Sequence, residues 1–158
     1  MIEILMRDIF WSGLAALGFA LLFNVPRRTL PGCVIAGAAG HGLRTLLMTG
    51  GASIEGATLV GATCIGFLSV YGGRYWHTPP AIFAVSGVIP MIPGRFAYGT
   101  MIGLLQLAQL GADTPQTVLV DISVNAIKTA LILGALAVGI TTPTMLFTRQ
   151  KPAVKTDP

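Results

Sequence analysis

The residues best suited to chemistry in this sequence lie in an apolar stretch that contains His41 and Arg44. Residues three apart share one face of a helix, so the two side chains would act together. An arginine in such surroundings tends to face a cavity, an acidic partner or the carboxylate of a substrate. His41 is a candidate for carrying a proton, because histidine titrates near neutral pH. The alternatives are an arginine that snorkels to the outer interface and a neutral core histidine.

A second group of residues interrupts a later apolar stretch, in the sequence Val-Ile-Pro-Met-Ile-Pro-Gly-Arg at 88–95. Pro90 and Pro93 each remove a backbone donor, and Gly94 permits a turn, so we expect a broken helix here. Discontinuous helices recur at the binding sites of transporters, where freed carbonyls line the site. Arg95 follows the break directly and is a second candidate for binding a carboxylate. The alternative is a kink that serves packing alone.

The last apolar stretch carries a polar stripe made of Asp121, Asn125 and Lys128. Their spacings of four and three place them on one helix face. Asp121 is a candidate for carrying a proton, and it could also pair with Arg44 or Arg95 from another helix. The alternative is that the stripe only joins helices, since polar contacts of this kind average about 0.6 kcal/mol in membranes.

The charges within the apolar stretches favour some functions and exclude others. The stretches contain three cations (Arg44, Arg95 and Lys128) and only one carboxylate, Asp121. This excess of positive charge favours an anionic or zwitterionic solute and disfavours a cation pump. The sequence has no phosphate loop, zinc-binding helix, dinucleotide fingerprint or catalytic serine motif, so we expect neither an enzyme nor a bound cofactor or metal. The basic residues form no patch, so we expect no nucleic-acid partner.

The composition indicates what kind of elements must position these residues. Of the 158 residues, 53% are hydrophobic and 10% are charged, and the mean hydropathy is +0.76. Soluble domains carry about 25% charged residues, so this chain is predicted to be an all-α polytopic membrane protein. We expect a transmembrane helical domain over 1–148 and a short disordered cytoplasmic tail over 149–158. The expected spans are 9–25 (or from residue 2), 30–48, 54–71, 80–110 with its break at the Pro-x-x-Pro-Gly motif, and 117–147.

The basic residues outside these spans predict an orientation. Six of the ten lie on one side of the five-span arrangement, and the opposite side holds only Arg7. Lysine and arginine accumulate in cytoplasmic loops, so we expect a periplasmic amino terminus and a cytoplasmic carboxyl terminus. Small residues also recur four apart, which favours close helix packing. These pairs are Ala36 and Gly40, Ala57 and Gly61, and Gly99 and Gly103.

Several short motifs together resemble one known family. They are Phe-Asn-Val-Pro-Arg at 23–27, Gly-His-Gly-Leu-Arg at 40–44, and Ile-Pro-Met-Ile-Pro-Gly at 89–94 with Tyr98 and Asn125 beyond. In order and spacing, over about 9–147, the chain resembles the short, YjjB-like subunit of the threonine/serine exporter (ThrE) family. The resemblance implies a bacterial inner-membrane secondary exporter of threonine and serine, or of a dicarboxylate such as succinate. It also implies a larger, YjjP-like partner subunit.

The sequence departs from that family at Arg95, Asp121 and Lys128, where uncharged side chains would be expected, and the added cations favour a dianion. We expect an exporter subunit for small organic acids or hydroxy amino acids, driven by an ion gradient. The alternatives are a homo-oligomeric channel and a scaffold that transports nothing. Polar residues that converge on one cavity favour transport, and residues on separate faces favour a scaffold. The expected roles are substrate binding by Arg44, Arg95 and Asn125, a helix break at Pro90, Pro93 and Gly94, and proton coupling by His41 or Asp121.

Overall fold

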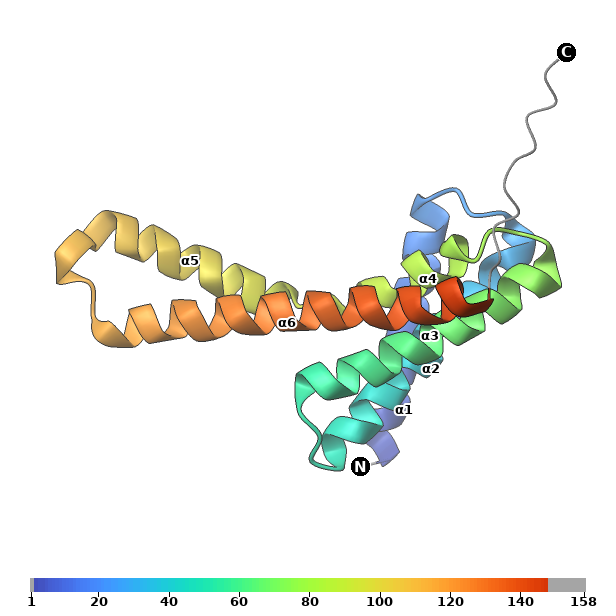
Figure 1. Ribbon diagram of the computed structural model, residues 1–158, viewed down its shortest axis with the longest axis horizontal. Helices are drawn as coiled ribbons and strands as arrows, with labels where there is room; N and C mark the ends of the chain where they lie inside the picture. Colours follow the sequence, from blue (N-terminus) through green and yellow to red (C-terminus); the bar gives the residue numbers. More distant parts are fainter. Residues whose placement is uncertain (1, 148–158) are drawn as a thin grey trace, which may run out of the picture.

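The computed structural model describes residues 2–147, and every regular element in that range is a helix (Figure 1). This confirms the predicted all-α class. The predicted tail over 149–158 lies outside the described residues. The elements, in chain order, are α1 (Ile2–Leu22), η1 (Arg27–Thr29), α2 (Leu30–Thr49), α3 (Ile54–Trp76), α4 (Ala81–Val88), η2 (Ile89–Met91), α5 (Gly94–Leu110), η3 (Gly111–Asp113) and α6 (Gln116–Phe147).

The first four helices form a packed body in which α2 contacts α1, α3 and α4. Helix α2 can approach α3 closely because Gly40 and Gly61 meet at their crossing. A Cβ on Gly61 would lie 2.7 Å from the carbonyl oxygen of Gly40. Small residues at a crossing let helix backbones pack tightly where hydrophobic burial offers no driving force between helices. Two of the predicted small pairs, ending at Gly40 and Gly61, therefore mark a true helix contact.

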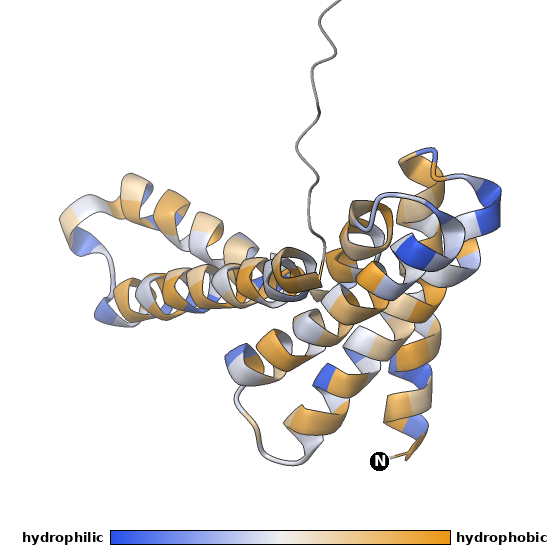
Figure 2. Ribbon diagram, turned by 45° about the vertical axis from the view of Figure 1, so that its right-hand side comes forward, coloured by the Kyte–Doolittle hydropathy of each residue, from blue (hydrophilic) through white to orange (hydrophobic). Residues whose placement is uncertain are grey.

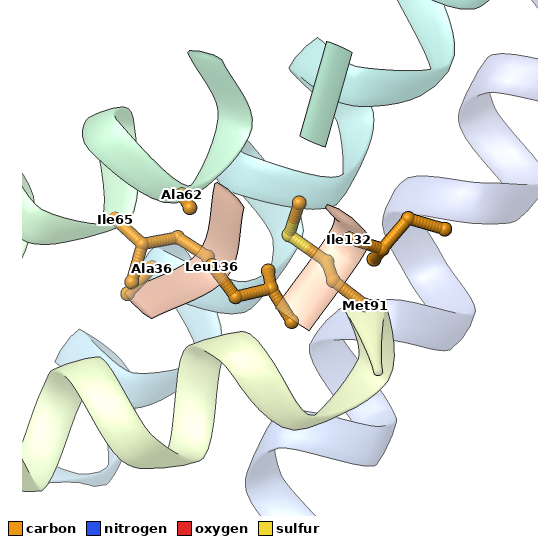
Figure 3. Close-up of a cluster of buried hydrophobic side chains, with 6 residues drawn as sticks. All are labelled: Ala36, Ala62, Ile65, Met91, Ile132 and Leu136. Carbon is orange, nitrogen blue, oxygen red and sulfur yellow. The ribbon is translucent and has the colours of Figure 1, made fainter. Parts of the chain in front are cut away.

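One buried cluster ties the distant parts of the chain together (Figure 3). Met91 is a member of this cluster with no exposed surface, although it belongs to the short η2 segment. The cluster therefore anchors the broken segment against α2, α3 and α6. Its buried members are Ala36, Ala62, Ile65, Met91, Ile132 and Leu136.

The fourth apolar stretch is broken, as the two prolines predict. The segment Ala81–Met91 meets Gly94–Asp113 at an angle of 56°. Sharp kinks in helices exceed about 20°, so this is a break rather than a gentle bend. At the junction Ile92 is extended, with φ −59° and ψ 133°, and Pro93 offers no N–H to continue the ladder.

Beyond the break, α5 and the first half of α6 form a hairpin that extends away from α1–α4 (Figure 1). Helix α5 packs chiefly against α6, where Gly103 accommodates the side chain of Ile122. The second half of α6 returns along α3, with which it makes the most extensive helix contact in the fold. The hairpin thus presents long apolar faces that no other part of the described chain covers.

The helices have the length and surface of a membrane protein. Three of them, α1, α3 and α6, are long and apolar enough to span a bilayer, and the bent pair makes a fourth. Helix α2 has 20 residues but is not among these spans, since its glycines together with His41 and Arg44 lower its hydropathy. The count of five spans therefore stays a prediction. The long helices consist mainly of hydrophobic residues (Figure 2). Many of their large apolar side chains are exposed, among them Phe10, Leu22, Phe67 and Val138.

Candidate functional site

A polar pocket of about 410 Å³ lies between α1 and α2. Both of the residues singled out on α2, His41 and Arg44, contribute to its wall. They are joined by an acidic residue of α1, Asp8, so that one cation and one carboxylate share a small space. The lining residues are Asp8, His41, Arg44, Thr45, Met48 and Thr49.

Asp8 is held in this pocket by a hydrogen bond from the neighbouring helix. The hydroxyl of Thr45 donates to Oδ2 of Asp8 at 2.7 Å. Nδ1 of His41 lies 3.9 Å from the same oxygen, too far for a hydrogen bond, and this buried nitrogen has no partner in the described chain. Sequence reasoning missed Asp8, because it placed the residue outside the first span. The one available signal was the possible start of that helix at Ile2, which puts Asp8 inside α1.

Arg44 connects the pocket to the helix break. Its Nη1 donates to the backbone carbonyl of Met91 at 3.3 Å. In an unbroken helix that carbonyl would accept from the N–H of residue 95, but the break at Ile92 and Pro93 removes this partner. The Arg44 guanidinium therefore faces the carbonyl freed at the break, while its buried Nε has no hydrogen-bond partner in the described chain.

The α2–α3 crossing leaves room for this contact because Gly61 has no side chain. A Cβ at Gly61 would lie 2.9 Å from Cε of Met91 and 3.3 Å from Cβ of Arg44. The glycine thus sits beside both partners of the hydrogen bond that links α2 to η2. The close packing of α2 and α3 at Gly61 therefore positions the Arg44 side chain next to Met91.

The polar stripe of the last helix lies elsewhere, in a second pocket of about 250 Å³ between α5 and α6. Asp121 and Asn125 line it together with Tyr98 and Gln106. Asn125 packs against Gly99, where a Cβ would lie 2.9 Å from its side-chain nitrogen. The third member of the stripe, Lys128, places its ammonium 5.3 Å from the ring centre of Phe96, a cation–π contact.

The structure therefore brings together only some of the residues that the sequence singled out. His41 and Arg44 meet the break, whereas Asp121 and Asn125 lie on the hairpin. Arg95 is exposed on the first turn of α5 and lines neither pocket, so the two arginines do not face one cavity. At the break itself, Pro90 is half-buried, Pro93 is buried and Gly94 is exposed.

A larger hollow of about 680 Å³ lies between α4 and α6. Its walls carry apolar side chains and the hydroxyls of Thr141 and Thr144, with no charged group. A carboxylate would find no cation there. We therefore place the candidate site in the smaller pocket between α1 and α2.

The apolar helices, the charged side chains held between them and the broken helix beside these charges are those of a multi-pass helical membrane protein. The model of the family "Threonine/Serine exporter, ThrE" matches residues 8–146, and the chain belongs to this family. It is accordingly a membrane component of an exporter. No solved structure matches the chain.

Proposed function

We propose that this chain is the short subunit of a secondary exporter of small carboxylates, and that the pocket between α1 and α2 binds the substrate carboxylate through Arg44. The observation that carries the proposal is the position of that guanidinium, which borders a pocket of about 410 Å³ and touches the carbonyl freed at the helix break. Only one guanidinium donor of Arg44 is engaged in the structure, by the Met91 carbonyl, so the half-buried side chain keeps other N–H groups for an anion. Guanidinium grips a carboxylate at two points, which suits this role.

The substrates proposed are threonine or serine, or a dicarboxylate of the size of succinate. The family match and the hydroxyl groups of Thr45 and Thr49 in the pocket wall support a hydroxy amino acid. Asn125 and Arg95 remain proposed substrate-binding residues beyond the break. Pro90, Pro93 and Gly94 supply the discontinuity that alternating-access transporters place at their sites.

Export is proposed to be driven by an ion gradient, with a proton carried by His41 or Asp121. The geometry supports His41 over Asp121, because His41 shares the pocket with Arg44 whereas Asp121 lies on the hairpin. An unpartnered buried nitrogen on His41 leaves a position where a proton can bind.

The proposed partner is a larger, YjjP-like membrane subunit in the bacterial inner membrane. The hairpin supports a partner, because its apolar faces are uncovered and α5 packs chiefly against α6. The same faces favour a homo-oligomeric channel as the alternative, in which a second copy covers them. A second alternative is a scaffold subunit, which is favoured by the separation of Asp121 and Asn125 on the hairpin from His41 and Arg44 on α2.

Efflux from loaded cells tests this proposal. Threonine and succinate efflux would be measured for the wild type and for Arg44→Gln, each normalised to the amount of protein inserted in the membrane. We expect Arg44→Gln to reduce efflux. The control is Arg7→Gln, which removes the charge of an exposed arginine on α1 and should leave efflux unchanged. Unchanged efflux of both solutes in Arg44→Gln would remove the pocket from transport.

Purification in mild detergent addresses the partner. Recovery of a larger membrane subunit with this chain would support the two-subunit exporter. Full efflux by this chain reconstituted alone would contradict it and would favour the homo-oligomer.

A further inference from the structure

We propose that Asp8 binds the ammonium group of the substrate, and that it thereby makes the pocket select an amino acid over a dicarboxylate. This inference rests on the proposed function, since it assumes that the pocket with Arg44 is the substrate site. It assigns a role to a residue of α1 that the motifs of the sequence do not include.

The first support is that the two opposite charges of the pocket are kept apart. In the described chain no oxygen of Asp8 lies within 4.0 Å of the Arg44 guanidinium, although both side chains line the same space. The hydroxyl of Thr45 holds Asp8, and the carbonyl of Met91 holds Arg44. A cation and an anion that share a pocket without an ion pair between them match the two ends of a zwitterion.

The second support is the unused capacity of the Asp8 carboxylate. A carboxylate has about four acceptor positions, and the structure fills one of them, with the Thr45 hydroxyl. The side chain keeps 34% of its surface exposed and faces the pocket. An ammonium group with three donors would fill the remaining positions and supply the missing counter-charge.

The charge balance then decides between the proposed substrates. Arg44 and Asp8 sum to zero, and His41 adds no charge while it is neutral. A bound amino acid leaves that sum unchanged, because its own charges cancel. A dicarboxylate would bring a second negative charge close to Asp8, and the two like charges would repel each other.

The test compares solutes that differ only in the amine. Threonine and 3-hydroxybutyrate, which is threonine without its amino group, would be offered to everted membrane vesicles from cells that express the full exporter, with succinate as a third solute. KM and maximal rate would be measured for the wild type, Asp8→Asn and Asp8→Glu. Asparagine can still accept from Thr45, so Asp8→Asn removes the charge and keeps the hydrogen bond.

We expect Asp8→Asn to lower the preference for threonine over 3-hydroxybutyrate by about tenfold or more, mainly through KM, since a site built for a polar group rejects the analogue that lacks it. Succinate transport should stay the same or rise, and Asp8→Glu should recover part of the preference. The control Glu3→Gln removes the charge of an exposed acidic residue on the same helix and should leave the preference for threonine unchanged. An unchanged preference in Asp8→Asn, or an equal loss for all three solutes, would overturn the proposal.

Arg44→Gln, measured in parallel, separates this inference from the proposed function. If Arg44→Gln impairs transport and Asp8→Asn keeps the preference, only the role of Asp8 fails. If Arg44→Gln has no effect on transport, the proposal that this pocket is the substrate site fails. If Asp8→Asn does not insert into the membrane, the wild type still decides, because equal transport of threonine and 3-hydroxybutyrate would overturn an ammonium site.

Discussion

At the scale of single residues, Arg44 is notable because its acceptor is a backbone carbonyl that the helix break leaves without a partner. A charged side chain within a membrane helix costs at least about 2.5 kcal/mol unless it is satisfied. The contact with Met91 meets part of that need and leaves the buried Nε free. The same guanidinium can therefore hydrogen-bond to the carbonyl at the helix break and bind an anion in the pocket.

Replacing Arg44 by lysine should restore only part of the efflux that Arg44→Gln loses. An ammonium group keeps the charge but lacks the planar fork that can hold a carbonyl and a carboxylate together. Efflux of threonine, normalised to inserted protein, measures the difference between the two variants. Wild-type efflux in Arg44→Lys would show that charge alone is sufficient and that the two-point grip plays no part.

The sequence predicted part of this site because its signals are local. His41 and Arg44 stand out by spacing on one helix. Asp8 does not, since its contact with Thr45 joins positions 37 residues apart and depends on how α1 pairs with α2. The sequence also singles out Arg95, as a cation next to the helix break, but it does not show that the 56° bend leaves Arg95 exposed on α5.

At the scale of elements, the crossing of α2 and α3 depends on the absence of a side chain at Gly61. We expect Gly61→Ala to destabilise the protein by about 1–3 kcal/mol, as overpacking usually does. The reason is that a Cβ would press on backbone at Gly40, which cannot yield as a flexible side chain can. The melting temperature in detergent measures this loss.

Gly134→Ala is the matched control for that prediction, because no atom lies within 4 Å of a Cβ placed at Gly134 of α6. Alanine in a helix interior is more stable than glycine by about 0.5–1 kcal/mol, so this variant should melt at the same temperature or higher. Equal melting temperatures for the two variants would contradict the close crossing.

The helix break should straighten when both prolines are replaced. Pro90→Ala with Pro93→Ala restores two N–H donors and removes two ring clashes, so the bend should fall well below 56°. Spin labels at the exposed positions Val85 and Met101 would measure the change as a longer distance across the break. Efflux should fall with it, because Met91 would regain a helical partner in place of Arg44.

A second label pair on α6, at the exposed positions Val124 and Val138, should keep its distance in the same variant. Both pairs require a background in which the free Cys33 and Cys64 are replaced. An unchanged distance across the break would mean that tertiary packing around Met91, rather than the prolines, maintains the bend.

The helices themselves were largely predictable, because length and apolar content mark them in the sequence. The expected stretches overlap with α1, α2, α3, the α4–α5 pair and α6, although α1 ends at Leu22 rather than at residue 25 and α3 continues to Trp76 rather than to residue 71. The size of the bend and the departure of the hairpin were not predictable, since both depend on contacts between distant segments. The glycines of α2 explain why its length suggests a span while its hydropathy does not.

At the scale of the whole molecule, the orientation in the membrane remains a prediction from the basic residues. A reporter fused after Arg149 should be active only in its cytoplasmic form, and one inserted in the loop 50–53 only in its periplasmic form. The reason is the positive-inside bias, since the loops and tail on the predicted cytoplasmic side carry most of the basic residues. Activity of a periplasmic reporter after Arg149 would contradict the arrangement of five spans.

The length of α6 has a consequence for the surrounding lipid. At 1.5 Å per residue its 32 residues extend over about 48 Å, whereas the hydrocarbon layer is about 30 Å thick. The helix must therefore tilt steeply or carry one end out of the layer. Its two halves are held by different neighbours, α5 and α3, so a change in tilt would move the hairpin relative to the body.

Bilayer thickness should consequently change the tilt of α6 and, with it, the rate of transport. In vesicles of matched composition but increasing acyl-chain length, we expect transport of the purified exporter to pass through a maximum and to fall on either side. Hydrophobic mismatch costs fractions of a kcal/mol per Å, enough to shift a balance between two tilts. A rate that stays flat across the series would mean that α6 sits at one fixed angle whatever the membrane around it.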